Sequence, residues 1–157
     1  MTVDARQFYW TAPPFEEQPL FRAADDVVAG WMELANHAQS ELEGFGIPAT
    51  VLVADDRVGL GADPGAQLIV CNARPFGVIL TWEPSIRGTE EFRNIVLNRS
   101  TTSPLLRYVA EGRNLMTEAC MAVLSAAGFS TARDHFEGTG YDYRVLFAPQ
   151  IPIIERE

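Results

Sequence analysis

The chain of 157 residues contains no lysine, since all twelve of its basic residues are arginine. A Schiff base, an attached pyridoxal phosphate and a phosphate-binding P-loop each require a lysine side chain. The absence of lysine therefore excludes these classes of enzyme. The sequence also lacks the Gly-x-Ser-x-Gly motif that presents the nucleophile in one large class of hydrolases.

Cysteine and histidine are scarce. The chain contains two residues of each type, Cys71, Cys120, His37 and His135. No two of them stand at the short spacings of zinc ligands, and disulfide-stabilised domains contain more cysteines at closer intervals. We therefore expect no disulfide framework, no structural zinc and no cofactor.

Positive charge is scarce as well, because 12 basic residues face 21 acidic ones and the net charge is −9. A nucleic-acid-binding protein needs a basic surface, so we expect no nucleic-acid partner. No apolar run approaches the ~20 residues that cross a bilayer, and residues 1–10 lack the apolar core of a secretory signal. We expect a cytoplasmic protein without a membrane partner.

The residues that are present are typical of one folded domain. Apolar residues make up 47% of the chain, and a domain of this length buries about 70% of the surface that its unfolded chain exposes. Residues 1–19 differ from the rest, because three consecutive aromatic residues at 8–10 are followed by closely spaced prolines. Prolines favour extended backbone. The sequence therefore predicts an extended arm over residues 1–19 and a single domain over residues 20–157.

Apolar periodicity predicts three helices. The first covers residues 20–45, and its apolar stripe consists of Val27, Trp31, Leu34, Ala38, Leu42 and Phe45. The second begins at Thr89, a good N-cap, and ends near residue 99. The third begins at Ser103, which is followed by proline, and ends at Gly128. Its predicted buried face consists of Leu105, Val109, Gly112, Met116, Ala119, Cys120, Val123 and Ala127.

Runs rich in β-branched and aromatic residues predict strands over residues 50–54, 67–71, 76–82 and 141–147. The short connection at 72–75 indicates an antiparallel hairpin. The order α-β-β-β-α-α-β predicts an α+β fold, with an antiparallel sheet of about four strands and helices on one face. This order resembles that of small acidic secretion chaperones, in the order of elements alone and without a shared motif.

Alternation along the strands leaves the second face of the sheet unusually apolar. A sheet face in contact with water is normally polar. This face consists of Leu52, Ala54, Ile69, Cys71, Gly77, Ile79, Thr81, Arg144 and Leu146. The arm, the C-terminal tail, a second subunit or a ligand must therefore cover it. Together with the apolar termini, this face predicts a homodimer.

Four acidic residues follow or precede predicted strand ends, and hairpin connectivity would bring these ends to one edge of the sheet. They are Asp55, Asp56, Asp63 and Glu83, with Arg87 nearby. Such a cluster indicates contact with a basic partner or a divalent cation. The alternative is that these loops are acidic because the whole protein is acidic.

No residue pattern identifies a catalytic site. The sequence favours an acidic protein-binding module without catalysis, in an adaptor, chaperone-like, inhibitor or immunity role, with a basic or apolar protein partner. The alternative is a small enzyme or a small-molecule-binding protein that uses an apolar pocket on the second sheet face. In that case Thr81, His135 and Arg144 are the candidate polar anchors, and a pocket over Ile69, Ile79 and Leu146 is expected.

Overall fold

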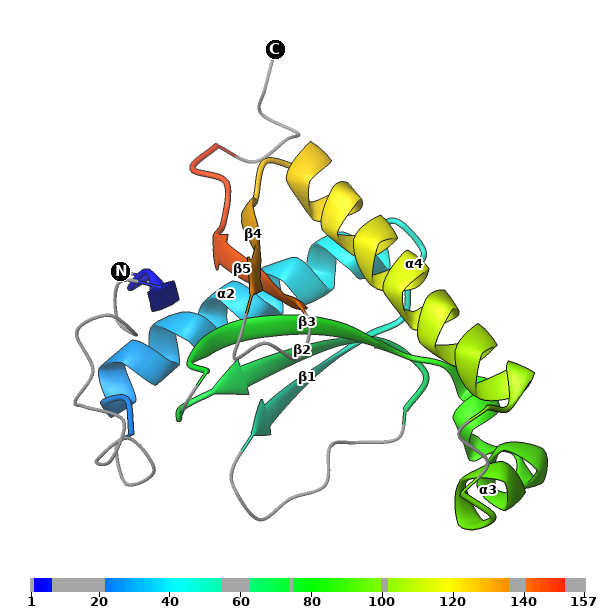
Figure 1. Ribbon diagram of the computed structural model, residues 1–157. Coiled ribbons are helices and arrows are strands. Elements are labelled where there is room, and N and C mark those ends of the chain that lie inside the picture. The colour runs from blue at the N-terminus through cyan, green and yellow to red at the C-terminus, as the bar shows by residue number, and fades with distance from the viewer. Residues whose placement is uncertain are drawn as a thin grey trace.

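The computed structural model describes residues 2–6, 22–54, 63–73, 75–99, 102–135 and 141–151. Figure 1 shows the arrangement of its helices and strands. In chain order they are α2 (Asp25–Gly44), β1 (Ala49–Ala54), β2 (Gly65–Cys71), β3 (Gly77–Glu83), the 3-10 helix η2 (Ser85–Gly88), α3 (Glu90–Leu97), α4 (Pro104–Ala126), β4 (Ser130–His135) and β5 (Tyr141–Phe147). The fold belongs to the α+β class, as predicted.

The sheet has five strands in the order β1-β2-β3-β5-β4. Strands β1 and β2 are parallel, whereas the other neighbouring pairs are antiparallel. The predicted antiparallel sheet of about four strands and the order α-β-β-β-α-α-β are therefore wrong. The sheet is mixed, and a further strand precedes the last one.

The parallel pairing of β1 and β2 changes which strand ends lie together. Residues 55–64 separate the two strands, far more than a tight hairpin turn requires. Ala54, at the end of β1, lies opposite Cys71, whereas Gly65 lies opposite Glu83. Along the direction of the strands, the end of β1 therefore lies at one end of the sheet and the end of β3 lies at the other.

Strand β4 is the element that the sequence did not reveal. Its residues Ser130–His135 read STARDH and lack apolar alternation. It is an edge strand that pairs only with β5, and a polar sequence suits a strand with one open side. His135, which lies outside every helix and strand predicted from the sequence, is therefore in a strand.

Helices α2 and α4 pack against the same face of the sheet, as predicted (Figure 1). The shared core joins side chains of both helices to those of the inner strands. Its largest fully buried members are Trp31, Phe76, Leu42, Leu68, Leu80, Leu124, Val70, Val78, Val145 and Cys120. None of the described helices is long and apolar enough to cross a membrane.

The first residues of the chain also contact this core. The indole Nε1 of Trp31 donates to the carbonyl oxygen of Val3 over 2.8 Å. Ala5 is buried and lies against Gly77, where an added Cβ would overlap it. Ala5 and Arg6 are helical rather than extended. The aromatic residues 8–10 of the predicted arm lie outside the described residues.

The predicted N-cap residues of helices α3 and α4 are confirmed. The hydroxyl oxygen of Thr89 accepts from the backbone N–H of Phe92, and that of Ser103 accepts from Leu105. Each cap satisfies one of the backbone donors that a helix leaves unpaired at its start.

The buried face of α4 differs from the prediction. Its buried residues are Val109, Thr117, Cys120, Met121 and Leu124. Met116 and Ala119 are exposed, and a Cβ added at Gly112 would meet no atom within 4 Å. Helix α4 therefore carries a second row of apolar and small residues that faces outward.

The second face of the sheet is largely buried within this single chain. Gln67, Ile69, Cys71 and Leu146 are all buried. These four side chains need no second subunit to cover them. Leu52, Ala54, Ile79 and Thr81 of the same face are half-buried, and the homodimer stays a prediction.

Candidate functional site

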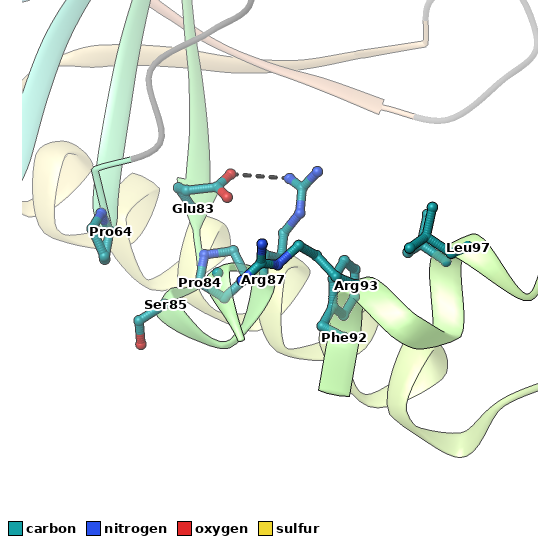
Figure 2. A pocket seen from close by; sticks show the side chains of 10 residues that line it. Pro64, Glu83, Pro84, Ser85, Arg87, Phe92, Arg93 and Leu97 are labelled. Carbon is teal, nitrogen blue, oxygen red and sulfur yellow. Dashed lines mark hydrogen bonds and ion pairs between the residues drawn. The ribbon is translucent and has the colours of Figure 1, made fainter. Parts of the chain in front are cut away.

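The surface around the end of β3 contains two adjoining hollows. The first has a volume of about 430 Å³ and lies between the end of β3, η2 and α3. Figure 2 shows Pro64 and Glu83 on one side of it, and Phe92, Arg93 and Leu97 of α3 on the other. Most of its lining is apolar.

Short local contacts hold the walls of the first hollow. Pro84 follows β3 and turns the chain into η2. Arg87 Nη1 and Glu83 Oε2 form an ion pair of 3.0 Å across this turn (Figure 2), and the Arg87 guanidinium lies 6.0 Å from the ring centre of Phe92. The Thr89 hydroxyl donates to the carbonyl oxygen of Ile86 over 2.7 Å. These contacts join β3, η2 and α3 into one unit.

The second hollow has a volume of about 340 Å³ and lies between η2 and α4. Trp82 and Ile86 line one side, and Tyr108, Gly112 and Met116 line the other. The three residues of α4 are spaced by four, so they share one side of the helix. Because glycine has no side chain, Gly112 leaves space between its two larger neighbours.

The two hollows share the segment Glu83, Pro84 and Ser85, together with Pro64. Large apolar side chains are exposed in the lining of these hollows and, at Leu115, next to Met116 on α4. They are Val96 (51% exposed), Leu97 (77%), Tyr108 (66%), Leu115 (67%) and Met116 (37%), five of the nine such side chains in the described part of the chain. We call the two hollows and these five residues the α3–α4 surface.

The α3–α4 surface lies in the least acidic part of the protein. Residues 84–116 contain five arginines and three glutamates, whereas the rest of the chain contains seven arginines and 18 acidic residues. Arg107 pairs with Glu111 over 2.9 Å. Within the described residues, the side chain of Arg93 forms no ion pair although it lines the first hollow. The local charge is therefore positive on an otherwise acidic protein.

A third, more polar cavity of about 280 Å³ lies between α4 and the strands. Its polar lining consists of Thr81, Arg113, Asn114, Thr117 and Tyr143. The Nε of Arg113 donates to the carbonyl oxygen of Trp82 over 3.2 Å, and its Nη2 donates to the hydroxyl of Thr81 over 3.3 Å.

A network of side chains borders this cavity. Glu118 pairs with Arg133 and accepts from the hydroxyl of Tyr143 over 3.2 Å. Arg133 also lies over the Tyr143 ring, 5.4 Å from its centre. Burial raises the pKa of Tyr143, and the hydrogen bond to Glu118 raises it further. Tyr143 is therefore a neutral donor at physiological pH.

The predicted acidic cluster is only partly within the described residues. Glu83 lines both hollows and is paired with Arg87, and Asp63 is exposed beside Pro64. Asp55 and Asp56 lie outside the described residues. The hairpin argument that placed them beside Glu83 is wrong, because β1 and β2 are parallel.

Two of the three predicted anchors of a pocket on the sheet face, Thr81 and Arg144, have different surroundings in the structure. Thr81 lines the cavity beside Arg113. Arg144 is buried, and it donates to the carbonyl oxygens of Phe76 and Pro75, the latter over 2.8 Å. It holds the turn between β2 and β3. The side chain of His135 lies outside the described part.

The described residues contain no group of three or more histidine, cysteine, aspartate or glutamate side chains that is placed to hold a metal ion. Both cysteines are buried and unpaired with each other. Burial raises the pKa of the Cys120 thiol to about 11. Cys120 is thus a protonated packing residue rather than an activated nucleophile.

Sequence reasoning missed the α3–α4 surface. The sequence pattern assigned Gly112 and Met116 to the buried face of the helix and did not assign Tyr108 to any face. A signal was present in Gly112, because a glycine inside a long helix lowers stability unless packing or binding requires it. No family model, no curated protein and no solved structure matches the chain.

Proposed function

We propose that the protein is a protein-binding module that uses the α3–α4 surface to hold a partner segment rich in apolar and acidic side chains. The observation that carries the proposal is the concentration of exposed Val96, Leu97, Tyr108, Leu115 and Met116 around two joined hollows. Contiguous apolar surface of this kind is typical of interaction sites. Partners of such sites insert a few large side chains into pockets.

The charge of the surface supports an acidic partner segment. Arg93 lines the first hollow without an ion pair in the described residues, and Arg87 stands beside it. Attraction between opposite charges accelerates association and disfavours partners of the wrong sign. A basic partner, which the overall charge of −9 favours, would instead bind the acidic remainder of the protein.

The shape of the second hollow supports insertion of a side chain beside α4. Gly112 removes the side chain that any other residue would place between Tyr108 and Met116. A partner side chain placed there would contact Trp82 and Ile86 on the opposite wall. The predicted role is therefore binding through shape and burial, in an adaptor, chaperone-like or inhibitory capacity.

The experiment is a selection of binding peptides from a random peptide library displayed on phage, with the full chain immobilised. We expect selected peptides that combine aromatic or aliphatic residues with aspartate or glutamate. A selection without enrichment, or one enriched in lysine and arginine, would contradict the proposal.

Variants of the full chain then locate the site of the selected peptides. Gly112→Leu fills the second hollow, and its matched control Ala29→Leu adds the same kind of side chain on the exposed side of α2. We expect Gly112→Leu to weaken peptide binding by about tenfold, the effect of losing ~1.4 kcal/mol. Ala29→Leu is expected to have no effect. Equal binding by both variants would place the site elsewhere.

A second copy of the chain is the other occupant to test, because the apolar termini and the apolar second face of the sheet predicted a homodimer from the sequence. Light scattering at micromolar concentration distinguishes the masses of one and two chains, 17.3 kDa for one. We expect a monomer with a free α3–α4 surface. A dimer that Leu97→Glu separates into monomers would show that the surface binds a second copy instead.

A further inference from the structure

The cavity between α4 and the strands exists because two neighbouring strands separate. Strands β3 and β5 pair only from Val78 to Leu80. Beyond this point β3 continues beside β2, and β5 remains paired with β4 as far as Tyr141. Backbone groups of β3 at Thr81 and Trp82 therefore have no partner on β5.

Arg113 occupies this separation. From α4, its guanidinium donates to the carbonyl oxygen of Trp82 and to the hydroxyl oxygen of Thr81. A guanidinium has five N–H donors, and three of them have no acceptor among the residues that the structure describes. Arg113 forms no ion pair with a carboxylate among the described residues. A half-buried cation without a counter-ion favours binding of an anion.

The other polar groups of the cavity extend this preference. The Thr81 hydroxyl oxygen accepts from Arg113, so its own hydrogen is available for donation. The Asn114 side chain supplies two further N–H donors at the rim. Glu118, one helical turn beyond Asn114, is already paired with Arg133. Among the described residues that line the cavity, Arg113 is the one that carries a charge.

Apolar residues complete the lining. Ile79, Leu80 and Ala110 border the cavity, whose volume of about 280 Å³ is close to the lower limit for small-molecule sites. Donors on one side and apolar side chains on the other match a ligand with one anionic group and a short carbon skeleton. The planar fork of the guanidinium fits a carboxylate with two parallel hydrogen bonds.

We propose that this cavity binds a small monocarboxylate, with Arg113, Thr81 and Asn114 donating to the carboxylate and Ile79, Leu80 and Ala110 contacting its carbon skeleton. This site is independent of the partner-binding role of the α3–α4 surface, although Arg113 also borders the second hollow. Loss of peptide binding at that surface would leave the carboxylate site intact.

The test is a titration of the 15N-labelled full chain, followed by NMR, with acetate, butyrate and benzoate, each paired with the corresponding uncharged amide. We expect saturable shifts of the Arg113 side-chain Nε–H, the Thr81 amide and the Asn114 side chain with at least one carboxylate. The amides, which lack the charge, are expected to bind about tenfold more weakly or not at all. No saturable shift with any of the three carboxylates would overturn the proposal.

Two kinds of variant keep the test independent of folding. Arg113→Gln removes the cation and its bonds to β3, and Thr81→Val removes one donor while keeping the shape of the side chain. Ala110→Leu narrows the cavity from an exposed helical position, and Ala122→Leu, on the same helix outside the cavity lining, is its control.

We expect the first three variants to weaken carboxylate binding and Ala122→Leu to leave it unchanged. Binding that persists in Ala110→Leu, or shifts confined to Arg87 and Arg93, would show general attraction of anions to the arginine-rich surface and would contradict the cavity site.

Discussion

Replacing Gly112 by alanine is expected to stabilise the protein, even though it narrows the second hollow. Gly112 lies near the middle of α4, where glycine destabilises a helix by about 1 kcal/mol relative to alanine. A Cβ added there meets no atom within 4 Å, and the backbone is not in the left-handed region. Neither a clash nor strain therefore opposes the methyl group. We expect the free energy of unfolding to rise by ~0.5–1 kcal/mol.

The measurement is urea unfolding of the wild type and Gly112→Ala, followed by circular dichroism. The expected gain corresponds to an increase of ~1–4 °C in Tm for a domain of this size. The matched control is Ala122→Gly, which makes the reverse change at an exposed position of the same helix and is expected to lower stability by a similar amount.

Gly112→Ala also connects the stability of the protein with its binding of peptides. If the hollow beside Gly112 receives a partner side chain, Gly112→Ala binds the selected peptides less tightly while it unfolds less readily. A decrease in stability would refute the structural reasoning, because it would mean that the methyl group meets a neighbour. Increased stability with unchanged peptide binding would show that the glycine is not needed for docking.

Two further predictions concern buried groups. Arg144→Met is expected to lower the free energy of unfolding by about 2–4 kcal/mol, because the carbonyl oxygens of Phe76 and Pro75 lose the guanidinium N–H groups that donate to them. Urea unfolding measures this loss. A loss below about 0.5 kcal/mol, which is typical of a surface substitution, would contradict the prediction. Burial raises the pKa of the Cys120 thiol to about 11, compared with 9.0 in the unfolded chain. Between these two values the unfolded chain ionises more readily than the folded one, so the free energy of unfolding decreases as the pH rises from 9 towards 11 and is unaffected by this thiol below pH 9. Urea unfolding of the wild type and Cys120→Ala across this range measures it, and an equal decrease in both would exclude Cys120 as a cause.

The helices could be predicted from the sequence because their signals are local. The N-caps Thr89 and Ser103 and the apolar period of α2 depend on residues within a few positions of one another. Strand pairing is not local in this way. The parallel alignment of β1 and β2 depends on the path of the ten residues between them, and the apolar composition of the strands suits either direction.

The site was missed for a related reason. Periodicity shows that Tyr108, Gly112 and Met116 share one side of α4, but it does not show which side faces the sheet. Helix α4 has two rows of apolar and small residues, and the row through Cys120 and Leu124 is the one that the core buries. Only the packing of α4 against β3 and α2 decides between them.

Strand β4 and Arg113 illustrate a second limit. The edge position of β4 allows a polar sequence that resembles a loop. Arg113 has its role because β3 and β5 separate at Thr81, and no local pattern in the sequence marks that separation. Long-range geometry thus defines the second hollow and the polar cavity.

The central claim is that the α3–α4 surface binds a partner segment, and mapping a selected peptide onto the 15N-labelled full chain by NMR tests it most directly. We expect the largest shifts at Val96, Leu97, Tyr108 and Gly112, with smaller or no shifts along the acidic exposed side of α2. The largest shifts on α2 or on the edge strand β4, with Leu97 and Gly112 unaffected, would contradict the claim.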